Sequence, residues 1–400
     1  MTLEIKRNNT DPSILLANPR LKIIGSTDGT FPARGHHQPG EMYGVWLHPY
    51  KLLDGFKMHV KEKGLESSNL QLLADGITVG ISGNTYEYNQ SVGHSHFDLK
   101  RNDYIPVHGT GFVSEYEFKN KDLQKTHTLF WQFTLNVNIR KVWDPDLENV
   151  FHNSNLQNTF DLERQKILVF DEKLHVGFAL SLNQAVKNAD FCQEKLPLTT
   201  RTKDQIKILG KLEVKAGETK KLRFNMLGFT DAWNEKIEEN LTLLTNLSHT
   251  AISEQRKIWL NGWLDQSRWI DLNTKKENYK EKSGNLSYGI DTNNREKTLE
   301  LTRELLPWLR FNTACLEQDT VKRRGLTAGQ PEYPWWFTCD SYYACQGLLC
   351  AGQFELVRET IEIILHSCQE NEPKYKVPHE ITTAGKIVHP GNMQEQAQIL

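Results

Sequence analysis

Two segments near the C-terminal end of the 400-residue sequence carry side chains that suit the chemistry of sugars. The first, residues 325–341, holds two glycines, two prolines and four large aromatic residues, Tyr333, Trp335, Trp336 and Phe337. Such rings can lie against the C–H face of a pyranose, and the carboxylate of Asp340 can accept hydrogen bonds from two hydroxyls. These residue types predict a sugar subsite. The alternative is a structural plug, in which Asp340 or Ser341 caps the next helix.

The second segment, residues 377–395, holds Glu380 and Glu395 together with His379 and His389. Glycoside hydrolysis needs one protonated carboxyl group and one carboxylate on opposite sides of the bond, and two glutamates in a Gly- and Pro-rich region fit that need. Alternatively, Glu395 lies in the first turn of a helix, where the macrodipole favours acids, and the histidines are surface residues. His379, Glu380 and His389 are also metal-ligand types, but their spacing matches no metal motif. We therefore predict neither a metal ion nor a cofactor.

The elements that must position these residues begin with a long region of period two, from about residue 20 to about residue 230. In its clearest run, apolar side chains alternate with polar ones at Leu129, Trp131, Phe133, Leu135, Val137 and Ile139. Similar alternation recurs at 77–81, 174–182 and 212–226, the last with a turn at 216–219. Strands joined by turns without intervening helices predict an antiparallel β-sandwich over residues 1–232.

After Asp231 the apolar spacing becomes helical. We expect a connecting helix over 234–265 and a polar, lysine-rich linker over 271–292, so that residues 233–292 join two domains. Apolar helices predicted at 296–317 and 341–368 make residues 293–400 an all-α domain. The chain stops in what resembles the first turns of a third helix, so we expect this domain to be incomplete.

Composition narrows the classes of partner. The formal charge is −2, and there is no basic stripe of the kind that binds nucleic acid or an anionic membrane. No stretch is apolar and long enough for a signal peptide or a membrane span. We expect a cytoplasmic protein whose partner is a neutral oligosaccharide or polysaccharide.

Both segments resemble one protein family. The run GLTAGQPEYPWWFTCDSYYACQGLLCAGQFELVRETIEII is similar to the glycogen-debranching and glucoamylase-like glycosidases of the six-hairpin toroid class, although Cys339 stands where the family usually has Arg. In VPHEITTAGKIVHPGNMQEQAQ, the stretch from Asn392 to Ala397 resembles the family's general-acid motif, and GVWLHPYKLLDG resembles a strand of its preceding domain. The resemblance implies an N-terminal antiparallel β-sandwich followed by an incomplete (α/α)6 toroid.

The resemblance also implies an activity: inverting hydrolysis of α-linked gluco-oligosaccharides or glycogen-like branches by a debranching-type α-glucosidase. It makes Glu395 the general acid, lets Asp340 hold glycone hydroxyls, and places the general base beyond Leu400. It implies that the subsite is lined by Glu380, Tyr333, Trp335, Trp336, His379 and Asn392. Two alternatives stay open, a sugar phosphorylase with a phosphate pocket in place of the base and a non-catalytic carbohydrate-binding fragment.

Overall fold

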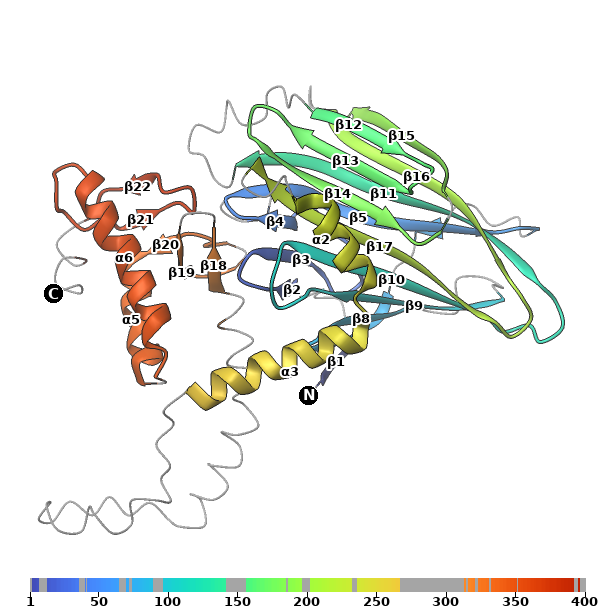
Figure 1. Ribbon diagram of the computed structural model, residues 1–400, viewed down its shortest axis with the longest axis horizontal. Helices are drawn as coiled ribbons and strands as arrows, with labels where there is room; N and C mark the ends of the chain where they lie inside the picture. The colour runs from blue at the N-terminus through green and yellow to red at the C-terminus, as the bar shows by residue number, and fades with distance from the viewer. Residues whose placement is uncertain are drawn as a thin grey trace, which may run out of the picture.

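A computed structural model gives the architecture of the chain. It describes residues 2–6, 13–35, 40, 42–64, 70–71, 74–88, 96–141, 156–184, 186–195, 202–231, 236–266, 313, 316–320, 323–330, 332–350, 352–391 and 395. Most of these residues belong to antiparallel β-sheets, which lie side by side with a smaller C-terminal segment, coloured orange to red in Figure 1.

Two sheets make up the N-terminal part of the described chain. One runs in the spatial order β1-β7-β8-β9-β10-β17-β14-β13-β12, and the other in the order β15-β16-β11-β5-β4-β3-β2, with β6 paired to β5. The strands are β1 Thr2–Lys6, β2 Ser13–Ala17, β3 Leu21–Ser26, β4 Gly44–Leu47, β5 Tyr50–Glu62, β6 Leu70–Gln71, β7 Ala74–Gly80, β8 Gly83–Tyr88, β9 Phe97–Tyr104, β10 Gly111–Asn120, β11 His127–Lys141, β12 Leu156–Asp161, β13 Lys166–Asp171, β14 Val176–Leu182, β15 Val186–Lys195, β16 Thr202–Val214 and β17 Thr219–Thr230.

The two sheets enclose one apolar core, which confirms the predicted sandwich. Strand β11 contributes every apolar residue of the alternating run from Leu129 to Ile139, and each of these side chains is buried. Phe130 points to the other face and is partly exposed. Trp131 lies opposite Gly210 of β16, where only a hydrogen leaves room for the indole. Burying a large apolar side chain contributes about 1.5–3 kcal/mol, so this strand is a main source of the sandwich's stability.

The connecting segment forms two helices where the sequence predicts one. Helix α2 spans Ile237–Asn246 and α3 spans His249–Gln266. The chain is extended at Leu247, and the Ser248 hydroxyl accepts a hydrogen bond from the amide of Ala251, so a local cap starts the second helix. The buried Arg256 of α3 donates to the carbonyls of Ala17 and Ile105, which fixes this helix to the sandwich.

The C-terminal segment contains short strands and a pair of helices: β18 Glu317–Asp319, β19 Arg324–Leu326, β20 Trp336–Phe337, α5 Thr338–Cys350, α6 Phe354–Glu370, β21 Glu380–Ile381 and β22 Ile387–His389. The prediction of one helix over 341–368 is wrong. Gly352 has a φ of +74°, in the left-handed region, and its amide donates to the carbonyl of Leu349. This conformation ends α5, and α6 begins two residues later.

Two predictions fall largely outside the described residues, the linker 271–292 and most of the helix 296–317. The last residue of that helix, Glu317, begins strand β18. The described part of the C-terminal segment has too few helices to close a ring, so the (α/α)6 toroid stays a prediction. The same holds for the domain limits at 232 and 292. No helix in the described part of the chain is long and apolar enough to cross a membrane.

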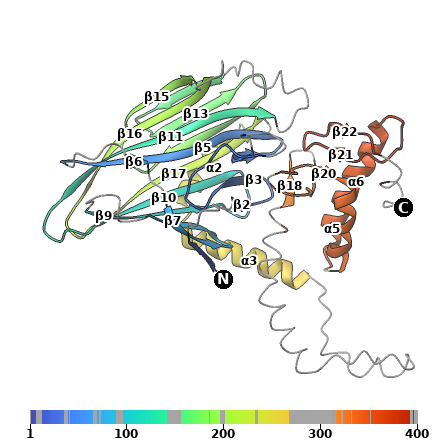
Figure 2. The same ribbon diagram turned by 180° about the vertical axis from the view of Figure 1, so that it is seen from behind.

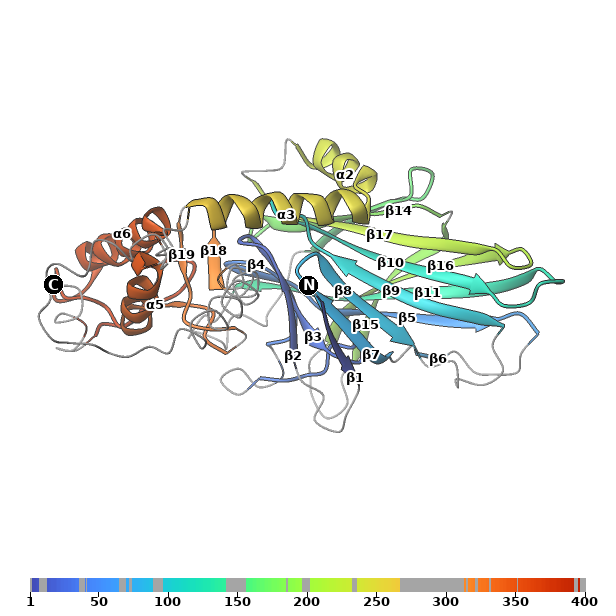
Figure 3. The same ribbon diagram turned by 90° about the horizontal axis from the view of Figure 1, so that it is seen from below.

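The views agree on how the parts are arranged. Figures 1 and 2 show β18 and β20 between the sandwich and the helix pair α5–α6. Figure 3 shows α3 running along the sandwich toward that helix pair, and the Gln353 side chain donates to the carbonyl of Trp263 in α3. The C-terminal segment therefore contacts both the sandwich and α3.

Gly210→Ala tests the core register of β11 and β16. A Cβ at this position would lie 2.1 Å from the Trp131 ring, so we expect the free energy of unfolding to fall by about 1–3 kcal/mol. The matched control is Gly262→Ala in α3, where a Cβ meets nothing within 4 Å. This control should raise stability by about 1 kcal/mol through helix propensity. Urea unfolding followed by tryptophan fluorescence measures both changes, and a neutral Gly210→Ala would contradict the register.

Candidate active site

The aromatic segment around β20 is buried on two faces. Trp335 and Phe337 join an apolar cluster with residues of the sandwich, namely Ile24, Met42, Tyr43 and Trp46. Trp336 points the other way and packs against Ile363 of α6 and Ile381 of β21. Successive side chains of an extended chain point to opposite faces. Three consecutive aromatic residues therefore join the sandwich to the helix pair.

The aromatic segment also fixes the position of residues 378–380, which include the predicted Glu380. Strand β20 pairs with β21 so that Phe337 lies opposite Glu380, and Glu380 in turn lies opposite His389 of β22. Thr338, the first residue of α5, donates its amide to the carbonyl of His379 at 3.1 Å and its hydroxyl to the carbonyl of Pro378 at 2.6 Å. The start of α5 and residues 378–380 therefore form one rigid unit.

His379 connects the two glutamates singled out by the sequence. Its Nδ1 lies 2.6 Å from Oε1 of Glu395, and its Nε2 lies 3.7 Å from Oε1 of Glu380. The imidazole is held by edge contacts with the rings of Phe337 and His389. The structure thus brings together three of the predicted site residues around one ring.

The two glutamates lie in different surroundings. Glu395 is 1% exposed, whereas the Glu380 side chain is about a quarter exposed. Burial penalises a carboxyl group that has no hydrogen-bonding partner, and His379 supplies such a partner to Glu395. A buried carboxyl group in contact with an imidazole, next to a carboxyl group that solvent reaches, is an arrangement in which general acid–base chemistry can operate.

The other predicted residues have different positions. Asp340 is exposed in the first turn of α5, where the helix dipole favours an anion, and the helix begins before it, at Thr338. Tyr333 is 46% exposed and lies edge-on to Phe337. Trp336 is 1% exposed, so it offers almost no ring surface to a ligand. Asn392 lies outside the described residues. Roles for these four residues in substrate binding stay predictions.

The sandwich contributes residues to this region that the sequence did not single out. His48 Nδ1 lies 3.4 Å from the hydroxyl of Thr383, between β21 and β22. Burial, with a smaller effect from the charge of Lys22, lowers the pKa of His48 well below its ordinary value. Lys22 also donates to the carbonyl of Glu317 at 2.8 Å. His48 lies within GVWLHPYKLLDG, the run that resembles a strand of the family's preceding domain, and that resemblance was the sequence feature that could have pointed to it.

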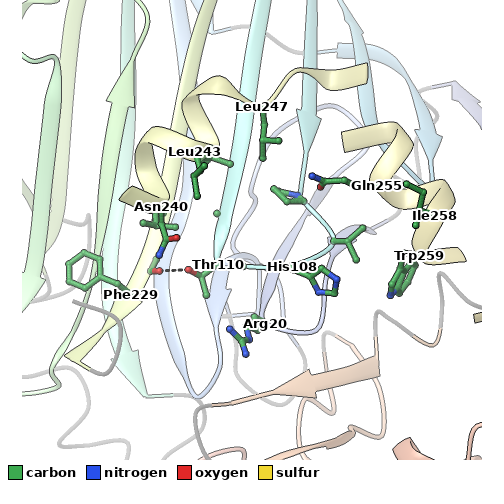
Figure 4. A pocket seen from close by; sticks show the side chains of 17 residues that line it. Arg20, His108, Thr110, Phe229, Asn240, Leu243, Leu247, Gln255, Ile258 and Trp259 are labelled. Atoms are coloured by element: carbon green, nitrogen blue, oxygen red, sulfur yellow. Dashed lines mark hydrogen bonds between the residues drawn. The ribbon is translucent and has the colours of Figure 1, made fainter. Parts of the chain in front are cut away.

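A pocket of about 570 Å³ lies elsewhere, between the sandwich and helices α2 and α3 (Figure 4). Helices α2 and α3 contribute Leu243, Ile258 and Trp259 to its lining, and the segment between β9 and β10 contributes His108 and Thr110. None of the residues that line this pocket is an aspartate or a glutamate. It therefore lacks the carboxyl groups that acid–base cleavage of a glycosidic bond requires.

Comparison with known proteins identifies the fold. No family model matches the sequence, and no curated protein matches it. Among solved structures, the whole chain matches a putative kojibiose phosphorylase from the human microbiome with a TM-score of 0.67 and 8% identity. It also matches a bacterial glucoamylase complexed with acarbose with a TM-score of 0.59 and 10% identity.

This likeness concerns the fold alone, because both identities are low. It confirms at that level the resemblance to glucoamylase-like glycosidases, and the debranching type stays a prediction. The chain spans 55% of the first structure and 58% of the second, so it corresponds to a little over half of each.

His379→Ala tests the contact with Glu395. The substitution removes a hydrogen-bonding partner from a buried carboxyl group, so we expect the free energy of unfolding to fall by about 1–3 kcal/mol. His366→Ala is the matched control, since His366 is exposed and lies 3.8 Å from Glu370 on the surface of α6. The control should change stability by less than about 0.5 kcal/mol. If urea unfolding gives the same small change in the free energy of unfolding for both variants, the contact between His379 and Glu395 does not stabilise the fold.

Proposed function

We propose that this chain belongs to a carbohydrate-active enzyme that hydrolyses α-glucosidic bonds in gluco-oligosaccharides or glycogen-like branches. The observation that carries the proposal is the contact of 2.6 Å between His379 and the buried Glu395, with Glu380 on the other edge of the same imidazole. The fold shared with a glucoamylase supports the substrate class.

In the proposed mechanism Glu395 is the general acid. A carboxyl group out of water favours its neutral form, and a neutral carboxyl group can protonate the leaving oxygen of the glycosidic bond. His379 keeps this group oriented and can return a proton to it after each cycle. We propose that the reaction inverts the anomeric carbon, in which case a second carboxylate activates water from the opposite side.

The glycone would bind at the start of α5. Asp340 is exposed there, and its carboxylate can accept hydrogen bonds from two hydroxyls of one sugar. Tyr333 presents a partly exposed ring beside Phe337, so it is the better candidate for stacking than either buried tryptophan. Glu380 and Asn392 complete the proposed subsite.

Phosphorolysis is the second candidate, because the chain shares its fold with a putative kojibiose phosphorylase. A phosphorylase uses the same general acid and replaces the activated water with phosphate. Release of glucose from maltose, isomaltose, kojibiose and a branched dextrin is therefore measured with and without inorganic phosphate. Glucose 1-phosphate formed only with phosphate would replace the hydrolase proposal with the phosphorylase.

Asp340→Asn tests the subsite through binding. The amide keeps the size of the side chain but loses charge-assisted hydrogen bonds, so we expect affinity for acarbose or maltotriose, measured by calorimetry, to fall at least about tenfold. The melting temperature should hardly change, since Asp340 is exposed and α5 begins before it, at Thr338. The control is Glu239→Gln, an exposed acid in the first turn of α2. Unchanged affinity in Asp340→Asn would remove this residue from the site.

Glu395→Gln tests the general acid. The amide cannot donate an acidic proton, so turnover of maltose should fall by roughly 10²–10⁴-fold, with a much smaller loss on α-glucosyl fluoride, whose leaving group needs little protonation. The assay uses the 400-residue chain or a longer form of the same protein that shows turnover. Glu362→Gln, on the exposed face of α6, is the control. Equal losses on both substrates would assign Glu395 a binding role instead.

Absence of turnover bears on the non-catalytic alternative. If a form of the protein that extends beyond Leu400 binds acarbose but releases no product from any of these substrates, with or without phosphate, the non-catalytic carbohydrate-binding alternative replaces the enzyme.

A further inference from the structure

A second cluster of titratable side chains lies in the sandwich, away from the candidate active site. Glu62 ends β5, His96 directly precedes β9, and His127 begins β11. Oε1 of Glu62 lies 2.7 Å from Nδ1 of His96 and 2.8 Å from Nδ1 of His127. Three strand ends, which are far apart in sequence, therefore direct one ligand atom each toward a common point.

The two imidazole rings lie face to face. Their centroids are 4.0 Å apart with an angle of 20° between the planes, and the three potential ligand atoms all lie within 4.8 Å of one another. Glu62 is buried, His127 is mostly buried, and His96 has 44% of its side chain exposed. The common point is thus reachable from solvent on the His96 side.

Both ring nitrogens of His127 face carboxylates. Its Nδ1 faces Glu62, and its Nε2 lies 3.1 Å from Oδ2 of Asp122. A neutral imidazole can donate to only one of these two carboxylates, whereas an imidazolium can donate to both.

A bound cation is the alternative to an imidazolium in this arrangement. If the Nδ1 lone pair of each histidine and an oxygen of Glu62 face a metal ion, both imidazoles stay neutral, and the Nε2–H of His127 donates to Asp122. Two imidazoles and one carboxylate, with solvent at the open position, are a common ligand set for Zn²⁺. A carboxylate that orients a ligating histidine through its other nitrogen is the usual outer partner in such sites.

We propose that Glu62, His96 and His127 bind one Zn²⁺ ion or a similar divalent transition-metal ion, with Asp122 as the outer carboxylate that orients His127. The ion would join β5 and β11 of one sheet to the start of β9 in the other. These strand ends lie at the end of the sandwich opposite α5 and α6 (Figure 1). The ion would therefore link the two sheets at a site separate from Glu395, and its binding does not depend on the function proposed for that residue.

Metal binding by the tag-free 400-residue chain tests the proposal. After dialysis against EDTA, we expect calorimetry with zinc chloride to show one bound ion that raises the melting temperature. Glu62→Gln and His127→Ala should each weaken binding at least about 100-fold, and Asp122→Asn roughly tenfold. His175→Ala is the matched control, because His175 contacts a single carboxylate, Asp231, at 2.7 Å. This control should bind zinc as the wild type does.

His96→Ala guards against loss of folding, since this side chain is the most exposed of the three and its removal should leave the sandwich intact by circular dichroism. We expect this variant to fold and to lose the tight zinc site. Absence of zinc binding in the wild-type chain, or binding that persists at wild-type strength in both His96→Ala and His127→Ala, would overturn the proposal. The cluster would then be a hydrogen-bonded network without an ion.

Discussion

The two-sided burial of Trp335, Trp336 and Phe337 is the constraint on which the C-terminal part of the structure depends. Burying a large apolar side chain stabilises the folded protein by about 1.5–3 kcal/mol relative to leaving it in water. Because neighbours in an extended chain point in opposite directions, this segment can satisfy all three only between two apolar surfaces. The sandwich supplies one, around Trp46, and the α6–β21 side supplies the other, at Ile363 and Ile381.

The position of the candidate acid follows from that constraint. Once β20 is held, its pairing with β21 sets Glu380, and the bonds from Thr338 set residues 378 and 379. His379, which is in edge contact with the Phe337 ring, then meets the buried Glu395. The aromatic residues thus contribute to the site as a support that fixes the geometry, in addition to any contact of Tyr333 with substrate.

The fold does not choose between the two proposed reactions. A scaffold hosts different activities through changes at a few positions, and the two structures that share this fold carry the names of a phosphorylase and a glucoamylase. Hydrolysis and phosphorolysis both need an acid for the leaving group, the role proposed for Glu395. They differ in what attacks the anomeric carbon, which is why phosphate dependence separates them.

The sequence alone determined the features that depend on local periodicity and residue type. The alternating residues from Leu129 to Ile139 predict a half-buried strand, since a strand with one face in the core must alternate, and β11 confirms it. The aromatic residues and the acids and histidines of 377–395 were identified by type. The helix break at Gly352 was not predicted, because glycine inside a helical pattern can either continue a helix or end it.

Only the tertiary structure decided which side chains meet. It buried Trp336 against α6, placed His379 between Glu380 and Glu395, and brought His48 of the sandwich to Thr383. It also gathered Glu62, His96 and His127 from three strand ends in two sheets. Periodicity shows which face of a strand is buried. The neighbours of that strand follow from the order and packing of the sheets, which depend on contacts between residues far apart in the chain.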